Sequence, residues 1–263
     1  QLIRSFGVFF TSQFVRGRQL FGAKIIPNRG AWLEFETDLD GAIGVKIDRK
    51  RKAPATALLR VFSAMERNGG SPHAPISKLT NDDIKNFFTD INKGEVDYIE
   101  ATLAKDSSKN ADEGFIEVYK RIRPGDLATV DNARSFIQAM FSFERYDLKE
   151  VGRWRLNQRL RDVMGTYGQR KEITQEDRVL HIEDIIAVIK EIIRLNNTPN
   201  AKPDDIDHLG NRRVRTLGEL LQNKLRVGLT RTERIIRDKM STLDIYGLTP
   251  GQLINARPFI ASI

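Results

Sequence analysis

The spacing of apolar residues changes once along the chain, from short runs to longer runs with a helical period. Residues 1–50 contain short apolar or alternating runs that turn-forming residues separate. Runs of this kind, bounded by Pro, Asn, Asp and Gly, are typical of strands joined by tight turns. The expected strands are Val8–Phe10, Ala23–Ile26, Ala31–Thr37 and Ile43–Ile47, and the expected turns are Pro27–Gly30 and Asp38–Gly41. The pattern predicts a small antiparallel β element.

The third run places a tryptophan on its polar side. Its two alternating sets are Trp32, Glu34 and Glu36 on one face and Leu33, Phe35 and Thr37 on the other. A lone tryptophan is more often a core residue. This register, however, favours an exposed indole, which can stack on an unpaired nucleic-acid base.

From residue 80 onward the apolar residues recur at helical spacing. The clearest apolar stripe consists of Ile185, Ile186, Ile189, Ile192 and Ile193, within a helix expected over 183–195. Thr80 or Asn81 can cap one helix, and Pro54 suits the first turn of another. The other expected helices are 55–64, 81–92, 97–105, 111–121, 129–141 and 148–160. The stretch 68–72, which contains Gly and Pro, predicts a flexible break.

The segment after residue 215 has the strongest helical pattern. Thr216 with Glu219 forms a capping-box signature, and the helix is expected to continue to about Met240. Its apolar stripe is Leu217, Leu221, Leu225 and Leu229, joined by Leu220, Ile236 and Met240. At 100° per residue, Arg226, Arg234 and Arg237 fall within about 80° of one another on the opposite side. Guanidinium groups there suit phosphate contact, and a solvated helix face has the same pattern.

Composition narrows the class of protein. With 263 residues, 40% hydrophobic and 30% charged, the chain can form one large domain or two modest ones around a packed core. The net charge of +8 favours a polyanionic partner, and residues 212–239, with nine basic and three acidic side chains, supply +6 of it. The lack of cysteine excludes disulfides and thiolate metal sites. We expect an α+β fold, with a small antiparallel β element, a mainly helical body and a long C-terminal amphipathic helix.

The segment Asp204–Arg215 is the most informative part of the chain. It holds three aspartates, a histidine, a glycine, an asparagine and three arginines, with only three aliphatic residues. Burying such a run would leave several charges without partners, at a cost of several kcal/mol each. The segment is therefore expected to be a surface loop that either reads nucleic acid or forms a solvated salt-bridge network.

Two other functions are compatible with some of the residues. Asp204, Asp205 and Asp207 could hold a divalent metal in a nuclease, but their spacing matches neither a two-metal nor a calcium-loop pattern. A stand-alone DNA-binding regulator would place a short basic helix in the major groove, and the expected C-terminal helix is too long for that role. Asp48–Lys52 is a further basic run, which is suited to phosphate and is equally often only solvated.

Several motifs, in order, resemble those of the bacterial RNA polymerase β subunits. Asp204–Arg215 matches that family nearly residue for residue. Residues 1–10 resemble S-Q-L-x-R-S-P-G-V-F-F, and residues 26–36 resemble I-P-x-R-G-S-W-L-E-F-E. The remaining matches are 47–56, 123–125, 145–148 with 151–153, 223–234 and 254–258. The likeness covers essentially the whole chain and implies an internal fragment of such a subunit. It further implies that 1–215 form the β lobe and 216–263 an incomplete return segment into the protrusion.

The resemblance also implies roles for particular residues. Trp32 and Asp207 match residues that contact non-template-strand bases around and just downstream of the transcription start. Asp48, Arg123, Arg153 and Arg234 match neighbours in the same base-contacting pocket. These six residues, together with Arg226 from the helical pattern, are the expected DNA-binding residues. Val8 matches a position on the edge of the rifamycin pocket. Phe6 stands where the family has proline, which puts that edge in doubt, and Asn28 and Ala31 replace a common tyrosine and serine near Trp32.

The implied setting is the multisubunit polymerase, a nucleotidyltransferase. The expected partners are promoter, non-template and downstream DNA, the other polymerase subunits and a sigma factor, in the cytoplasm on the nucleoid. No catalytic residue, metal ligand or cofactor is expected in this segment, because the resemblance places the magnesium aspartates in the partner subunit. His73 and His181 have no obvious partners and receive no role.

Overall fold

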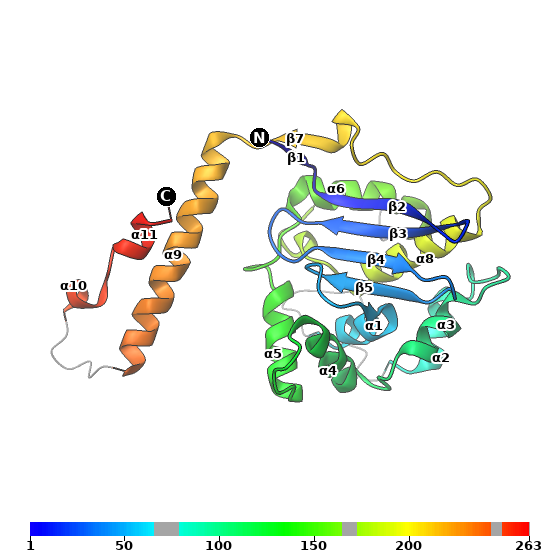
Figure 1. Ribbon diagram of the computed structural model, residues 1–263, viewed down its shortest axis with the longest axis horizontal. Coiled ribbons are helices and arrows are strands. Elements are labelled where there is room, and N and C mark those ends of the chain that lie inside the picture. The colour runs from blue at the N-terminus through cyan, green and yellow to red at the C-terminus, as the bar shows by residue number, and fades with distance from the viewer. Residues whose placement is uncertain (66–78, 165–172, 243–248, 263) are drawn as a thin grey trace. The chain divides into compact units, whose positions relative to one another are not determined.

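The computed structural model describes residues 1–65, 79–164, 173–242 and 249–262. It divides into two compact units, one formed by Ser5–Ile206 and the other by Gln1–Arg4 together with Asp207–Ile263. Small antiparallel sheets are combined with a larger helical part, so the fold is α+β as predicted (Figure 1). The predicted break at 68–72 and His73 lie outside the described residues. No described helix has an apolar stretch long enough to span a bilayer.

The larger unit contains a five-stranded antiparallel sheet in the order β2-β3-β4-β5-β6. Its strands are β2 (Gly7–Val15), β3 (Arg18–Ile26), β4 (Leu33–Thr37), β5 (Ile43–Ile47) and β6 (Ala53–Pro54). The four predicted strands are all present. β2 and β3 are longer than predicted because Arg16 and Gly17 close them into a hairpin, with φ values of 49° and 79° that favour a tight two-residue turn.

The two faces of this sheet differ in chemistry, as the alternation predicted. Leu33, Phe35 and Thr37 are buried, whereas Glu34 and Glu36 lie on the opposite face. That face carries a ladder of ion pairs between neighbouring strands. The pairs are Lys24–Glu34 at 3.1 Å, Lys46–Glu36 at 2.6 Å, Lys52–Glu36 at 3.3 Å and Lys52–Asp38 at 2.6 Å. Opposite charges facing each other across strands stabilise the pairing of β3, β4 and β5.

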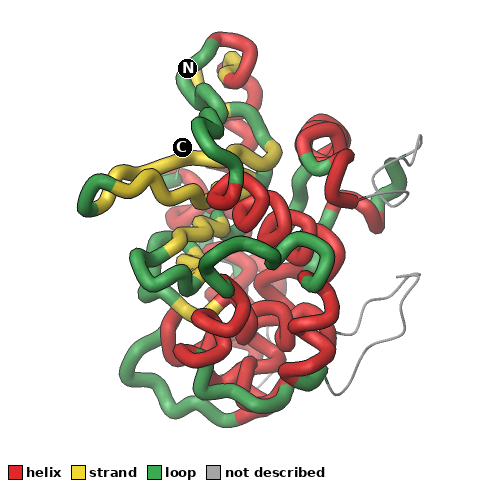
Figure 2. Tube along the Cα trace, turned by 90° about the vertical axis from the view of Figure 1, so that its right-hand side faces the viewer, coloured by secondary structure: helices red, strands yellow, loops and turns green. Residues whose placement is uncertain are grey.

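Helices form the rest of this unit, and Figure 2 distinguishes them from the strands by colour. They are α1 (Ala55–Ala64), α2 (Asn81–Phe88), α3 (Tyr98–Lys105), α4 (Ala111–Ile122), α5 (Val130–Phe141), α6 (Lys149–Arg159), α7 (Arg161–Met164) and α8 (Ile182–Asn197). Thr80, Asp97, Asn110 and Thr129 each accept a backbone N–H as N-caps, which explains where four of them begin. α1, α6 and α8 pack against strands of the sheet and share its hydrophobic core.

One expected helix ends several residues early in the structure, and Pro54 lies outside the helix in which it was expected. α2 ends at Phe88 and not at residue 92, because the Asn92 side chain bonds to Asp97 (2.6 Å) and to the Tyr98 N–H (3.3 Å) at the start of α3. Pro54 precedes α1 as its N-cap and pairs with Gly44 in the sheet, so it is not part of the first turn.

The smaller unit joins the two ends of the chain. β1 (Leu2–Arg4) pairs antiparallel with β7 (Arg212–Val214), and α9 (Leu217–Thr242) follows. α10 (Pro250–Leu253) and α11 (Arg257–Ile260) return along α9. Gly228, the one buried residue described in α9, provides the space, since an added Cβ would lie 3.1 Å from the Phe259 ring. The expected boundary at residue 215 thus lies inside this unit, and the assignment of its parts to lobe and protrusion stays a prediction.

Candidate nucleic-acid interface

Trp32 and Asp48 face each other at the ends of two paired strands. The Trp32 N–H donates to Asp48 Oδ1 at 2.9 Å, and the Asp48 N–H donates to the Trp32 carbonyl at 2.9 Å. Leu33 and Ile47, the adjacent residues, are register partners in β4 and β5, so the sheet itself brings the two together. Asp48 has a φ of 48°, a left-handed conformation that aspartate tolerates better than most residues.

The indole of Trp32 is neither fully buried nor fully exposed. The Arg49 guanidinium carbon lies 5.7 Å from its ring centroid, a cation–π contact, and Arg49 Nε lies 3.8 Å from Glu34. Arg49 is exposed, as are Asp48, Lys50 and Arg51 in the following turn. The basic run predicted from the sequence therefore lies on the surface beside a partly exposed aromatic ring.

Arg123 lies at a different place on the same unit. It is the exposed residue that ends α4, and its guanidinium stacks over the Phe136 ring at 4.5 Å. Asp126, three residues on, lies 3.6 Å from it. An exposed guanidinium that lies over an aromatic ring can still contact a phosphate or a base.

Arg153 is not on the surface. Its side chain is 2% exposed and forms a bidentate ion pair with Asp184, with N–O distances of 2.6 and 2.9 Å. It also donates to the Asp177 and Val179 carbonyls. Burial alone raises the pKa of Asp184, but the charge and hydrogen bonds of Arg153 outweigh it and hold that pKa below its usual value. The geometry gives Arg153 a structural role in the described residues, and its implied place in the base-contacting pocket stays a prediction.

Val8 is also a core residue in this structure. It is 4% exposed, pairs with Ile25 across β2 and β3, and belongs to the main hydrophobic cluster. Phe6, which replaces the proline of the family, is 7% exposed and packs beside Gly152 of α6. Both side chains are buried against protein in the described structure, including Val8, which the resemblance places on the edge of the rifamycin pocket.

The Asp204–Arg215 segment is divided between the two units. Asp204 is bound to β2 of the larger unit, whereas Asp207 begins the smaller one. Asp207 is exposed, and one of its carboxylate oxygens lies 3.8 Å from Arg212. The structure adds two residues that sequence reasoning did not select. Arg4 and Arg212 are register partners in the β1–β7 pair, which places two like charges side by side near Asp207. No local signal could have shown this, because the pair joins residues that are more than 200 positions apart.

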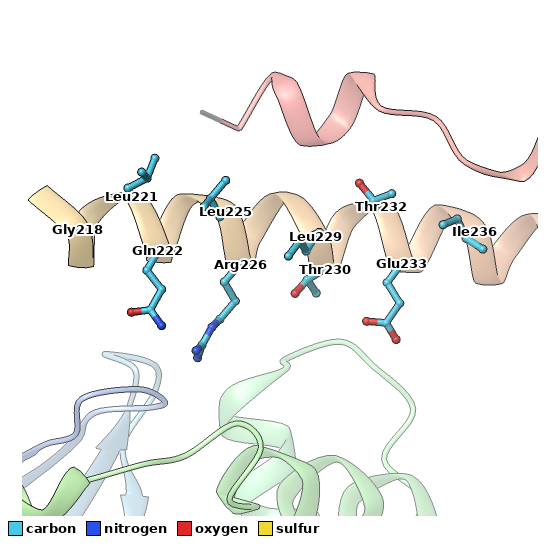
Figure 3. Close-up of a pocket in the computed structure, with 10 residues that line it drawn as sticks. All are labelled: Gly218, Leu221, Gln222, Leu225, Arg226, Leu229, Thr230, Thr232, Glu233 and Ile236. Carbon is cyan, nitrogen blue, oxygen red and sulfur yellow. The ribbon is translucent and has the colours of Figure 1, made fainter. Parts of the chain in front are cut away.

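The arginines of α9 are exposed, as the helical pattern predicted. Arg237 pairs with Glu233 at 2.8 Å and Arg234 lies 4.0 Å from Asp238, each one turn along the helix. Figure 3 shows Arg226 and Glu233 on the side of α9 that faces away from the α10–α11 segment, and Leu221 and Leu225 on the side towards it. A groove of about 710 Å³ along α9 is lined by four residues of the apolar stripe, Leu221, Leu225, Leu229 and Ile236, together with polar residues that include Arg226 and Glu233. Leu217 and Leu229 remain 81% and 60% exposed.

Two of the three aspartates considered as metal ligands contact arginines, Asp204 with Arg159 and Asp207 with Arg212. Across the described ranges no three His, Asp or Glu side chains gather as a metal ion would require. Asp204, one of the three aspartates considered as ligands, binds Arg159 and the Phe10 N–H instead. His181 is buried and caps α8, which gives it a structural role.

Comparison with known proteins identifies the class. The family model described as RNA polymerase Rpb2, domain 2, matches residues 89–215. The whole chain is 47% identical to the DNA-directed RNA polymerase subunit beta of Chloroflexus aggregans, and 41% identical to that of Dehalococcoides mccartyi. It spans about a fifth of the length of these relatives, 22% and 19% respectively. The protein class is thus that of the Rpb2-type subunits of multisubunit RNA polymerases. Within it, the chain belongs to the family of DNA-directed RNA polymerase β subunits.

Proposed function

We propose that this segment forms one wall of the DNA channel of an RNA polymerase and contacts non-template and downstream DNA. The observation that carries the proposal is the Trp32–Asp48 pair. Two opposed hydrogen bonds hold the backbone of a partly exposed tryptophan in place, next to an exposed carboxylate and an exposed arginine. An aromatic face, an acceptor and a cation at one spot are the groups that unpaired bases and their phosphates require.

Each group would have a distinct role. The Trp32 ring would stack on an unpaired base, a contact worth about 1–3 kcal/mol. Asp207 would accept a hydrogen bond from a base amino group, and Asp48 would hold Trp32 in place. Exposed Arg123, Arg226 and Arg234 would contact phosphates, which supply affinity without base preference. Arg4 and Arg212 add positive charge beside Asp207 and suit the same role.

The assembled protein implied by the family is a nucleotidyltransferase. This segment would act with the other polymerase subunits and a sigma factor, in the cytoplasm on the nucleoid. The catalytic Mg²⁺ would be bound by the partner subunit, and the segment would position DNA without taking part in the chemical step.

Asp207→Ala in the assembled polymerase tests the proposal. We expect the base preference near the start site to fall by about 5- to 160-fold at one position, since one base contact contributes about 1–3 kcal/mol of discrimination. Total DNA affinity should change much less. Asp205→Ala is the matched control, because it removes the same charge two residues away. An equal effect of both variants, or an unchanged base preference in Asp207→Ala, would contradict the assignment.

A further inference from the structure

Asp204 attaches the start of the charged segment to the outer edge of the sheet. Its N–H donates to the Phe10 carbonyl at 2.8 Å, and its carboxylate Oδ2 accepts from the Phe10 N–H at 2.8 Å. β2 is an edge strand, so these are backbone groups that the sheet leaves without a partner. One aspartate therefore satisfies both polar groups of one strand residue.

Arg159 of α6 holds this aspartate from the other side. Its Nε lies 3.2 and 3.1 Å from the two carboxylate oxygens of Asp204, and its guanidinium lies over the Phe10 ring at 4.5 Å. The same arginine donates through Nη1 to Glu191 of α8 at 2.8 Å. We call Phe10, Arg159, Glu191 and Asp204 the clasp. It joins a strand, two helices and the entry of the charged segment.

The clasp is charged and partly shielded from water. The Glu191 side chain is 3% exposed, and those of Arg159 and Asp204 are 30% and 24% exposed. Burial would raise the pKa of Glu191, but hydrogen bonds from Arg194 and Arg159 lower it, so the group stays ionised. A carboxylate kept charged in this position orients Arg159 towards Asp204.

The position of the clasp along the chain is what suggests a role beyond stability. Asp207 follows Asp204 by three residues, a distance of at most about 10 Å in an extended chain. The larger unit ends at Ile206, so Asp204 is among its last residues before the smaller unit begins. Whatever fixes Asp204 also limits the positions that Asp207 can reach.

We propose that Arg159 and Asp204 are positioning residues, which fix the entry of the 204–215 segment and thereby restrict Asp207 to the place where it meets a base. This inference rests on the proposed function, since it needs Asp207 to be a reading residue. Neither clasp residue is proposed to touch DNA. A clasp that only stabilised the fold would make the protein less stable when broken but would leave base preference unchanged.

The chain offers a closely matched control. Arg194 binds the same carboxylate, with its Nε 2.7 Å from Glu191 Oε2, but within the described residues it does not bind Asp204. Arg194→Gln and Arg159→Gln thus remove the same charge from the same cluster, and only the second releases Asp204. Asp204→Asn is a milder variant, because its amide oxygen can still accept from the Phe10 N–H while the charge that holds Arg159 is removed.

The experiment measures base preference near the start site in polymerase assembled with each full-length variant subunit. We expect Arg159→Gln and Asp204→Asn to lower that preference about threefold or more, Arg159→Lys to restore part of it, and Arg194→Gln to leave it within about twofold. In an Asp207→Ala background, Arg159→Gln should cause no further loss, because two residues acting through one contact are not additive. Hydrogen exchange at the Phe10 amide should rise in Arg159→Gln, which releases Asp204, and less in Asp204→Asn, which keeps an oxygen acceptor for that N–H.

The outcomes separate the two hypotheses. Equal loss of preference in Arg159→Gln and Arg194→Gln would overturn the positioning role, and so would full additivity with Asp207→Ala. An effect of Asp207→Ala without any effect of the clasp variants would overturn the clasp alone. An effect of the clasp variants without one from Asp207→Ala would refute both the role proposed for Asp207 and the proposal that the clasp positions it. If Arg159→Gln fails to assemble, Asp204→Asn and Arg159→Lys decide the question.

Discussion

Trp32 and Asp48 are bound to each other twice, in opposite directions, although 16 residues separate them along the chain. One bond uses the Asp48 carboxylate and the other its backbone N–H, so the aspartate closes the end of the β4–β5 pair. The backbone of the tryptophan is thereby held at the sheet end. This makes Asp48 a support for Trp32 as well as a candidate contact for DNA.

Asp48→Ala should weaken the attachment of the Trp32 backbone to the end of the sheet. The substitution removes the acceptor of the Trp32 N–H and places alanine at a positive φ, and together these should cost about 1–3 kcal/mol. Asp48→Asn keeps an oxygen acceptor and tolerates the same φ, so it should resemble the unchanged protein. Hydrogen exchange at the Trp32 amide is the measurement. Equal exchange in the two variants would show that this bond does not hold the tryptophan.

Trp32→Ala should shorten the lifetime of the open promoter complex while changing the melting temperature by only a few degrees. The reason is that the ring is partly exposed, so its removal uncovers less apolar area than removal of a core tryptophan. Trp154→Ala is the control, since Trp154 is 58% exposed on α6 and is not assigned to the site. A loss of stability of about 3–5 kcal/mol in Trp32→Ala would instead identify a structural ring.

Substitutions at Arg153 and Arg123 should distinguish a structural arginine from a surface arginine. Arg153→Met leaves Asp184 buried and without its partner, so we expect a loss of about 3–5 kcal/mol. Arg123→Met should alter stability by less than about 0.5 kcal/mol, because Arg123 is exposed. Thermal unfolding provides the comparison. Partial recovery in the double variant Arg153→Met, Asp184→Leu would confirm that the unpaired carboxylate is the cause.

The α9 arginines should contribute to the salt dependence of DNA affinity. Replacing Arg226, Arg234 and Arg237 together should reduce the log–log slope of DNA affinity against salt concentration by about one for each phosphate that these arginines neutralise. The control replaces Lys93, Lys109 and Lys120, which are exposed on the other unit. Both triple replacements remove the same total charge. If both triple variants flatten the slope equally, only net charge is responsible.

The ion-pair ladder on the sheet should make stability depend on pH through Glu36. Burial raises the pKa of Glu36, but hydrogen bonds and charge from Lys46 and Lys52 outweigh it, so the folded-state pKa is lowered. A carboxyl with a lowered pKa stabilises the fold above its unfolded pKa of about 4.3 and loses that contribution as pH falls through the folded value. Glu36→Gln should therefore be less stable near neutral pH, and the difference should shrink below about pH 4. A constant difference across that range would exclude this linkage.

Local structure was largely readable from the sequence. The four strands, the helix over Ala55–Ala64 and the long helix from Leu217 all follow from apolar spacing, because periodicity reports directly which face of an element is buried. The order of the motifs predicted the polymerase β family, which the comparisons confirmed. The alternation around Trp32 correctly placed Glu34 and Glu36 away from the core.

The site depended on tertiary structure wherever contacts join residues that are distant in sequence. Arg153 and Arg123 are the same residue type and both match family motifs, yet one is buried on Asp184 and the other is exposed. The strand pairing of Arg4 with Arg212 and the ion pair between Arg159 and Asp204 likewise join segments far apart along the chain. A sequence pattern specifies the face of an element on which a side chain lies. Only packing decides what covers that face, and hence whether a charged side chain is buried on a partner or remains available to DNA.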